Sequence, residues 1–488
     1  MISLGIDIGG TGCKCVAFNE KGTQLALSYR EYPLQPGQVN LPPLVMRDAV
    51  FGVIRQCADE LEDLGSVKVI TVSSFGESFV TIDPNGNPVG DILLYFAEST
   101  DDGFSQLIES IGREKVMRTC RTLPDAFYSL SKMLYTKRQT AVGQFLFIAS
   151  YICWCLSGES VCDPSLACRS LLYDVEKGSW SEPLLTAAGI RKSQLPDLSP
   201  TGTIIGTLLP EVASELHLNS DVEVLIGAHD QIVNALGAGL QRVGDAVDTS
   251  GTCECITPLF AAMPTDMHFH EQNYCCVPYL QSGGYVTYAY NLSAGSVVRW
   301  FRDALGAAFA EEAERDGISI YDAFNRHCPE EPTNLMVLPF LQGMGGTPDL
   351  KLDATGAILG LTTSTRLPDI YRAILEGITY EMRYNQEQLH LGGIGFQCLH
   401  ACGGGARSAA WLQVKADILG CGIIPVETEE TGAMGSAILG FAATLGESPF
   451  DLASRFIRHG SPIRPIPAHQ DIYQKKYELY KQLRSSLC

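Results

Sequence analysis

The chain has 488 residues, too many for one ordinary hydrophobic core, so two domains are expected. Its 45% hydrophobic and 18% charged residues are typical of a water-soluble globular protein. The net charge of −20 argues against nucleic acid or an anionic membrane as the main partner.

Cysteine usage and the hydrophobic pattern favour a cytoplasmic location. The 17 cysteines are scattered without a Cys-x-x-Cys pair, and their odd number fits poorly with a complete disulfide framework. The first strand begins without a basic segment before it, so no signal peptide is expected. The most apolar run, residues 141–156, is shorter than the ~20 residues of a membrane span, and we expect a buried helix there.

The first predicted elements form a glycine-rich hairpin. Strands are expected at 2–8 and 13–18, joined by the turn "GGTG". Such a turn leaves backbone N–H groups free to converge on a phosphate, to which Thr11 adds a hydroxyl and Lys14 a cation. Asp7 is placed to hold a metal-bound water. An ordinary tight hairpin is the alternative, and the turn is neither a P-loop nor a dinucleotide fingerprint.

Strands and helices alternate along the rest of the chain. Further strands are predicted at 67–73, 79–82, 223–226, 244–249, 253–258, 285–290, 396–401 and 422–426. Periodicity and capping residues predict helices at 43–63, 126–137, 229–239, 367–390, 407–420, 431–445 and 470–485. This mixture predicts an α/β fold.

A second acid follows a buried strand in "GAHDQIVNALGAG", residues 227–239. Asp230 and Gln231 stand at the start of a predicted helix. An acid in this position is often only a helix cap, since the helix dipole favours its charge. The functional interpretation is a general base that removes a proton from an attacking hydroxyl.

The opening hairpin has an echo in "AVDTSGTCEC", residues 246–255. Both contain Asp, two residues, then Gly-Thr, and Asp248 lies 241 residues after Asp7, close to half the chain length. This spacing favours duplication. We therefore expect two similar α/β domains facing each other across a cleft, at 1–243 and 244–488.

Two glycine-rich segments follow near the carboxyl end. "ACGGGARSAAWLQVKADILG", residues 401–420, has three glycines between a strand and a helix, where bare backbone can approach a nucleotide. "ETGAMGSAILG", residues 430–440, is typical of tight helix packing rather than of a site.

Together these motifs resemble the FGGY family of carbohydrate kinases. The resemblance runs over essentially the whole chain in the family's order. It also covers "LSGESVCDPSLACRSLLYD" (156–174), "SAGSVVRWFRD" (293–303) and "GAILGLTTSTRLPDIYRAILEG" (356–377). In the last stretch, Gly356, Gly360, Asp369 and residues 373–376 have the spacing of the family's signature.

The resemblance implies two duplicated actin-like ATPase (ribonuclease H-like) domains with an active-site cleft between them. It implies ATP-dependent phosphorylation of a hydroxyl of a small sugar or polyol, with Mg²⁺ as cofactor. Asp230 matches the catalytic base and Asp7 the metal-linked acid. Glu77 and Gln231, with Asp230, match substrate-binding positions. The positions that match nucleotide and phosphate contacts are Gly10, Thr11, Lys14, Gly251, Thr252, Gly295, Gly404 and Gly405.

The sequence departs from the family in the sugar pocket. Beside Glu77, an arginine of glycerol kinase is replaced by Gly76, and an acid of many relatives is replaced by Ala97. We expect Glu77 on one strand face with Phe79 and Thr81, pointing into the cleft. A solvent-exposed glutamate at a strand edge is the alternative. These departures leave the sugar unidentified.

We therefore expect an ATP-dependent carbohydrate kinase whose partners are a small sugar or polyol and ATP, without nucleic acid or membrane; a homodimer is left open. The main alternative is an actin-like, nucleotide-dependent binding or regulatory protein, because fold alone does not decide function. A base at Asp230 favours the kinase. A catalytically dead sugar-binding relative is the other alternative, against which Asp7, Thr11, Asp230 and Thr252 count.

Overall fold

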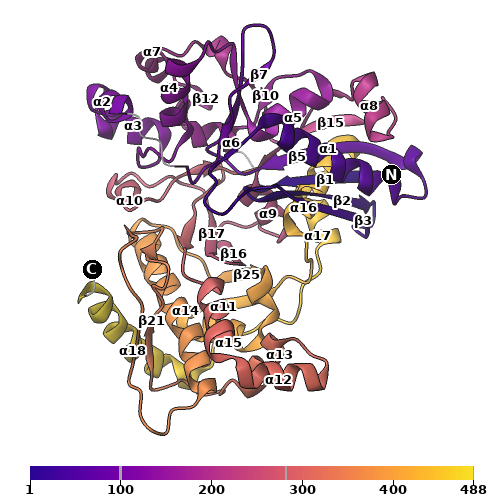
Figure 1. Ribbon diagram of the computed structural model, residues 1–488. Coiled ribbons are helices and arrows are strands. Elements are labelled where there is room, and N and C mark those ends of the chain that lie inside the picture. Colours follow the sequence, from indigo (N-terminus) through magenta and orange to yellow (C-terminus); the bar gives the residue numbers. More distant parts are fainter. Residues whose placement is uncertain (98–101, 281–282, 487–488) are drawn as a thin grey trace. The chain divides into compact units, whose positions relative to one another are not determined.

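The computed structural model describes residues 1–97, 102–280 and 283–486, which form two compact units (Figure 1). Unit 1 comprises Met1–Gly239, Cys276–Gly284 and Glu430–Ile457. Unit 2 comprises Leu240–Cys275, Tyr285–Glu429 and Arg458–Cys488. The main join lies near the predicted one, but a single boundary between 1–243 and 244–488 is too simple, because residues 430–457 belong to the first unit. No helix among the described residues is both long and apolar enough to span a bilayer.

A mixed sheet forms the centre of unit 1. Its strand order is β14 (Thr203–Thr207), β15 (Glu223–His229), β5 (Val67–Ser74), β1 (Ile2–Ile8), β2 (Gly12–Asn19), β3 (Gln24–Glu31). The predicted opening hairpin is confirmed, with Asp7 opposite Lys14. Strands β1, β5 and β15 are parallel, and Ser74 pairs with both Ile8 and His229. The carboxyl ends of these three strands therefore meet at one edge, where α/β sheets bind ligands.

Close helix packing explains why residues 430–457 belong to unit 1. The helix α16 (Thr431–Leu445) packs on α9 (Asp230–Gly237) and on β1. A Cβ on Gly435 would lie 1.8 Å from the Val233 carbonyl oxygen, and one on Gly237 would lie 1.8 Å from that of Thr431. Only glycine permits this approach, so the prediction of tight packing at 430–440 is confirmed.

The apolar run at 141–156 is not one helix. Residues Gln144–Phe147 form strand β9, which pairs with β6 (Phe79–Ile82), and the buried helix α5 (Ile148–Ser157) follows directly. Both elements are buried, so both require apolar residues, and hydrophobicity alone cannot locate the change from strand to helix. The other helices of unit 1 are α1 (Pro43–Asp59), α2 (Asp102–Ile111), α3 (Arg113–Cys120), α4 (Ser129–Gln139), α6 (Pro164–Ala167), α7 (Glu182–Ala188), α8 (Pro210–Leu216) and α17 (Pro449–Phe456).

Unit 2 repeats the central strand arrangement of unit 1. Within it the strand order is β19 (Tyr285–Val286), β17 (Glu254–Phe260), β16 (Asp245–Ser250), β25 (Cys398–Cys402), β26 (Gly422–Pro425), and β20 (Ala289–Asn291) also pairs with β17. As β1 is antiparallel to β2 and parallel to β5, so β16 is antiparallel to β17 and parallel to β25. The structure thus supports the duplication inferred from the echo of Asp7 at Asp248.

The core of unit 2 is built around the long helix α14 (Leu367–Leu391). Its buried side chains, including Tyr371 and Tyr380, pack with Phe301, Phe324 and Tyr473 from neighbouring helices. The other helices of unit 2 are α10 (His268–Glu271), α11 (Gly295–Leu305), α12 (Ala307–Asp316), α13 (Ile320–His327), α15 (Ala409–Leu419) and α18 (Pro467–Ser486). This core supports the helices whose ends line the pocket described below.

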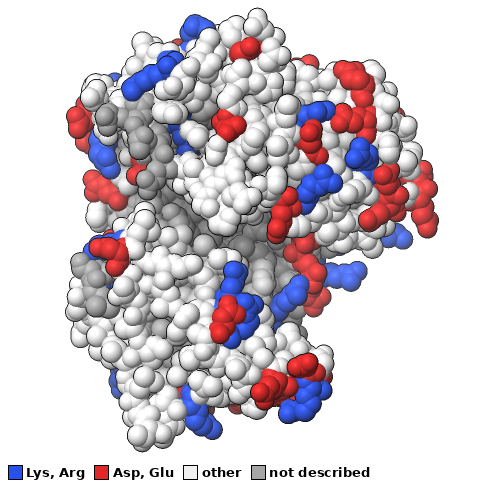
Figure 2. Space-filling model, viewed as in Figure 1, with Lys and Arg blue, Asp and Glu red and all other residues white. Residues whose placement is uncertain are grey.

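The charges on the surface of unit 1 are mixed. Figure 2 shows acidic side chains gathered on the face that carries α8 and the first strands, with basic side chains among them. Some of them pair, as Arg47 does with Glu215 at 2.8 Å and Lys68 with Asp221 at 3.7 Å. Exposed pairs of this kind contribute little to stability.

Candidate active site

Asp7 lies near the carboxyl end of β1 in a group of charged side chains. The Lys14 ammonium is 2.8 Å from Glu430 Oε2 and 4.0 Å from Asp7 Oδ2. The start of α16 lies against Asp7, since a Cβ on Gly432 would be 3.0 Å from Asp7 Oδ2. The two predicted residues Asp7 and Lys14 are thus brought together, with Glu430 as a partner that the sequence did not indicate.

The surroundings of the Asp7 carboxylate disfavour its charged form. Burial raises its pKa to about 6; Lys14 opposes the rise, whereas Asp230 and Glu430 add to it. The influence of Asp230 shows that the two carboxylates act on each other. Within the described chain, no cluster of three or more His, Cys, Asp or Glu side chains could hold a metal ion. A cation at Asp7 would therefore take its other ligands from phosphate and water, which is the habit of Mg²⁺.

Asp230 begins α9 directly after β15, with one carboxylate oxygen buried and left without a donor. The His229 imidazole caps the helix, because its Nδ1 accepts the backbone N–H of Gln231 at 3.2 Å. Nδ1 also lies 3.0 Å from Asp230 Oδ1. Oδ1 has no hydrogen-bond partner among the described residues, and the same is true of the buried Gln231 Oε1.

Glu77 is placed differently from the expectation. It does not share a strand face with Phe79 and Thr81, because β6 begins only at Phe79 and Glu77 precedes it in the left-handed region with φ of 63°. Its side chain is buried, which rules out the exposed strand-edge alternative. The left-handed backbone turns the carboxylate back toward the Arg169 guanidinium, with which Glu77 forms a buried ion pair.

Arg169 occupies space that Gly76 leaves open. A Cβ on Gly76 would lie 2.9 Å from Arg169 Cγ and 3.0 Å from His229 Cδ2. The arginine that is missing at position 76 is thus replaced by Arg169 of "ACRSLLYD", 92 residues after Glu77. The same contacts connect Glu77 to Asp230, because His229 adjoins Asp230 and touches Gly76. The structure therefore brings the predicted residues Glu77, Asp230 and Gln231 into one neighbourhood of unit 1.

Tyr128 and Lys132 also belong to this neighbourhood, and the sequence did not indicate either of them. The Arg169 guanidinium stacks on the Tyr128 ring, 4.8 Å from its centroid. Lys132 of α4 is completely buried and donates to the Phe127 carbonyl oxygen at 2.5 Å. Burial lowers the pKa of Lys132 to about 8, against the opposing effect of Glu77. The sequence signal that could have revealed Lys132 is the position of a lysine among the buried residues of an amphipathic helix.

The turn of the first hairpin contacts the aromatic segment that departs from the family. A Cβ on Gly10 would be 2.8 Å from the Tyr95 ring, so a larger residue there would have to displace that ring. Thr11 is exposed, which leaves its hydroxyl accessible to a ligand. Ala97 is buried at the end of the same aromatic segment. The turn of the first hairpin thus contacts the segment that contains Ala97.

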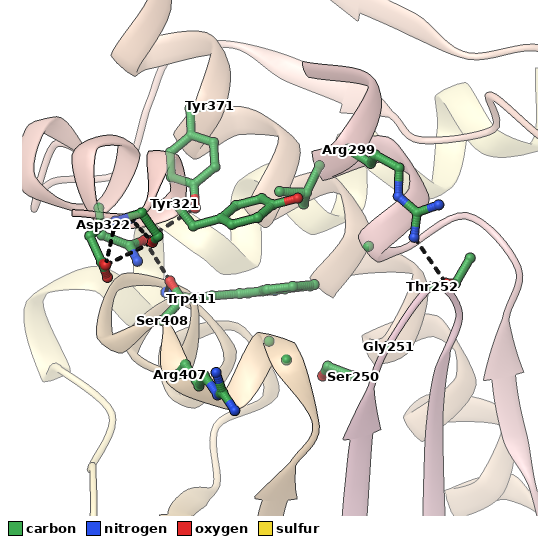
Figure 3. Close-up of a pocket in the computed structure, with 16 residues that line it drawn as sticks. Ser250, Gly251, Thr252, Arg299, Tyr321, Asp322, Tyr371, Arg407, Ser408 and Trp411 are labelled. Atoms are coloured by element: carbon green, nitrogen blue, oxygen red, sulfur yellow. Dashed lines mark hydrogen bonds between the residues drawn. The ribbon is translucent and has the colours of Figure 1, made fainter. Parts of the chain in front are cut away.

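A cavity of about 570 Å³ in unit 2 gathers the other predicted residues (Figure 3). All five predicted nucleotide positions of unit 2 line it: Gly251, Thr252, Gly295, Gly404 and Gly405. Gly251 and Thr252 form the turn between β16 and β17. A Cβ on Gly295 would lie 2.1 Å from the Gly251 carbonyl oxygen, so α11 starts hard against this turn.

The cavity has an aromatic end and a cationic end. Figure 3 shows the Tyr321 ring beside the flat Trp411 ring, with Tyr371 nearby, at one end. At the other end the Arg299 guanidinium donates to Thr252 Oγ1 at 3.3 Å. Aromatic faces can stack on a nucleobase, and a guanidinium beside a bare turn can bind phosphate. Arg299 was not predicted, although it lies in the motif 293–303.

Comparisons with known proteins agree with this geometry. Residues 2–237 match the N-terminal domain of the FGGY family of carbohydrate kinases, and residues 250–444 match the C-terminal domain. The chain belongs to this family. It is 26% identical to xylulose kinase of Bacillus subtilis (strain 168), over 98% of the chain and 96% of that protein. It is 28% identical to gluconokinase of Bacillus licheniformis, over 99% of the chain and 96% of that protein.

Solved structures show the same fold. Xylulose kinase from Lactobacillus acidophilus has a TM-score of 0.87 at 22% identity, over 100% of this chain and 98% of that one. Plasmodium falciparum glycerol kinase with ADP has a TM-score of 0.85 at 18% identity, over 100% of this chain and 98% of that one. The predicted α/β fold of two duplicated actin-like ATPase domains is confirmed. This FGGY protein is an ATP-dependent carbohydrate kinase, as predicted.

Proposed function

We propose that this kinase transfers the γ-phosphate of ATP to a hydroxyl of a small sugar or polyol, with Asp230 as general base. The observation that carries the proposal is the state of Asp230, whose Oδ1 is buried and has no hydrogen-bond partner in the described chain. A carboxylate oxygen without a donor is ready to accept the proton of an attacking hydroxyl.

The sugar is proposed to lie between Asp230 and Glu77. Glu77 can accept hydroxyl protons with the lone pairs that Arg169 does not use, and the buried Gln231 Oε1 offers a further acceptor. Arg169 fixes the direction of the Glu77 carboxylate. This division of roles leaves Asp230 free for proton transfer.

ATP is proposed to bind the cavity of unit 2. Its base would stack at Trp411 and Tyr321, and its phosphates would extend toward Gly251, Thr252 and Arg299. Gly10, Thr11 and Lys14 would contact the transferred phosphoryl group from the other hairpin. In both turns, bare backbone permits close approach of phosphate oxygens.

Mg²⁺ is proposed as the cofactor, linked to Asp7 through water. The fit rests on the place of Asp7 near the carboxyl end of β1, where 22% of its side chain is exposed and its Oδ2 lies 4.0 Å from the Lys14 ammonium. A cation would stabilise its ionised form, which burial disfavours by raising the pKa to about 6. When bound, Mg²⁺ would neutralise charge on the phosphates during transfer. The proposed cytoplasmic location is consistent with buried thiols such as Cys13, Cys57 and Cys120, which form no disulfide bond.

A panel of ketoses, aldoses, polyols and sugar acids, assayed by coupled ADP release, tests the proposal. Relatives named xylulose kinase and gluconokinase are the reason to begin with ketoses and sugar acids. Asp230→Asn is the matched control, since it keeps size and removes the base. Substrate-dependent ADP release that disappears in Asp230→Asn supports the proposal. ADP release that is independent of every sugar, or unchanged in the variant, favours a nucleotide-dependent binding or regulatory protein.

A further inference from the structure

Three ionisable side chains are completely buried directly behind the cavity of unit 2. Asp248 and Glu254 come from the two strands of the second hairpin, and Lys415 comes from α15. All three side chains are 0% exposed. The Lys415 ammonium contacts an Asp248 carboxylate oxygen and lies 2.9 Å from Glu254 Oε1. A buried lysine is costly to desolvate, so its retention here points to a specific task.

Lys415 also touches two residues that line the cavity. Its ammonium donates to Ser250 Oγ, and Ser250 immediately precedes the Gly251 turn. The same ammonium lies 4.6 Å from the centre of the Trp411 ring, which forms the aromatic end of the cavity. One buried cation therefore contacts both the side chain of the residue that precedes the Gly251 turn and the aromatic wall.

The space between these two contacts is closely packed. A Cβ on Gly405 would lie 2.6 Å from Ser250 Cβ and 2.9 Å from Trp411 Cζ3. A shift of the Ser250 or Trp411 side chain would therefore change the width of the cavity at Gly405. Lys415 holds both neighbours from behind: its ammonium donates to Asp248 and to Ser250 Oγ, and Glu254 Oε1 lies 2.9 Å from it.

The charge balance supports a fixed rather than a titrating lysine. Although burial opposes its charged form, Asp248 and Glu254 raise the pKa of Lys415 above its ordinary value. Burial raises the pKa of Glu254 to about 8, and Lys415 opposes this rise. The Lys415 ammonium stays in place because Asp248 and Glu254 both lie against it.

We propose that Lys415 is a positioning residue for the nucleotide, which sets the second phosphate turn through Ser250 and the aromatic wall through Trp411. This inference rests on the proposed function, in which that cavity binds ATP. Lys415 lies behind the wall and acts on the ligand only through its neighbours.

The test compares ADP binding by calorimetry, KM for ATP and sugar, and Tm in three forms of the full chain: wild type, Lys415→Met and the double variant Lys415→Met/Asp248→Asn. Lys415→Met leaves Asp248 buried without its partner, so a lower Tm is expected. The double variant removes both charges and should recover most of that Tm. In both variants the Kd for ADP and the KM for ATP are expected to rise about tenfold or more, with the sugar KM within about twofold of wild type.

A double variant with recovered Tm and wild-type ADP affinity would overturn the inference, because Lys415 would then serve stability alone. If neither methionine variant folds, Lys415→Arg keeps the cation but cannot keep both contact distances; its ADP Kd, measured below its own Tm, should still rise, and an unchanged Kd overturns the inference. Wild-type protein that binds ADP but phosphorylates no sugar would instead refute the proposed function.

Discussion

The Glu77–Arg169 pair offers the sharpest test of the sugar site, because the structure gives Glu77 two separable tasks. It is a proposed acceptor for a sugar hydroxyl, and it is the counter-ion of a buried arginine that is only 8% exposed. Glu77→Gln keeps the shape and removes the charge, so it disturbs both tasks at once. A single variant therefore cannot decide between them.

The expected magnitudes differ for the two tasks. Loss of a hydrogen bond to a charged acceptor costs about 1.5–3 kcal/mol, which corresponds to a rise of roughly 13- to 150-fold in the sugar KM. Loss of one partner of a buried ion pair costs about 3–5 kcal/mol of stability, or roughly 6–20 °C in Tm for a unit of this size. The KM for ATP should not change, because the cavity of unit 2 contains neither residue.

The assay is a double-mutant cycle of Glu77→Gln, Arg169→Met and the double variant, measured as sugar KM, ATP KM and Tm. Each single variant should lose Tm, and the double variant should regain much of it, since no buried charge is left unpaired. If Glu77 binds the sugar, the sugar KM stays high in the double variant. A sugar KM that returns to the wild-type value together with Tm would refute the reasoning and leave Glu77 as a counter-ion only.

Three other predictions address the remaining parts of the site. Asp230→Asn should lower kcat about 10²–10⁴-fold with the Kd for ADP unchanged by calorimetry; a variant that keeps more than about a third of wild-type kcat would contradict the role of base. Gly251→Val should weaken ADP binding without loss of Tm, because a Cβ there meets no protein atom closer than 3.8 Å and only a ligand would meet the added side chain; unaltered ADP affinity would remove this turn from the nucleotide site. Glu254→Gln should stabilise the protein at alkaline pH. The folded state keeps the Glu254 proton up to about pH 8, whereas an unfolded glutamate loses it near 4.5, so wild-type stability is lost as pH rises between these values. The Tm difference between variant and wild type should therefore grow from pH 5 to pH 9, and a constant difference would show that Glu254 is ionised throughout.

Local patterns were sufficient for the elements that carry the site. The hairpins at 2–18 and 245–260 were predicted closely, because alternating apolar residues around a glycine-rich turn have few other solutions. The helix α14 was predicted to within one residue at its carboxyl end. Over its 25 residues, the period of a helix is clearly distinguished from the two-residue period of a strand. The acids and glycines at the ends of these elements were therefore placed correctly.

Contacts between distant segments were beyond the reach of the sequence. The replacement of an arginine beside Glu77 depends on a turn at residues 168–170 that delivers Arg169 into the space above Gly76. Neither residue alone predicts this contact. Gly76 indicates only that the arginine is absent from that position, and Arg169 is one charged residue among many. The return of α16 to unit 1 is of the same kind. It depends on the fit of Gly435 against α9, which no local propensity expresses.

The two hairpins show how duplicated parts have taken different roles. Asp7 and Asp248 occupy equivalent positions, each opposite the partner strand and beside a parallel strand. Asp7 keeps about a fifth of its side chain exposed and lies 4.0 Å from Lys14, so it remains available to a cation. Asp248 is completely buried and bound by Lys415. If Asp7 alone holds Mg²⁺ with its waters and phosphates, as proposed, the second acid is not needed for a cation and can instead support the Gly251 turn through Lys415 and Ser250.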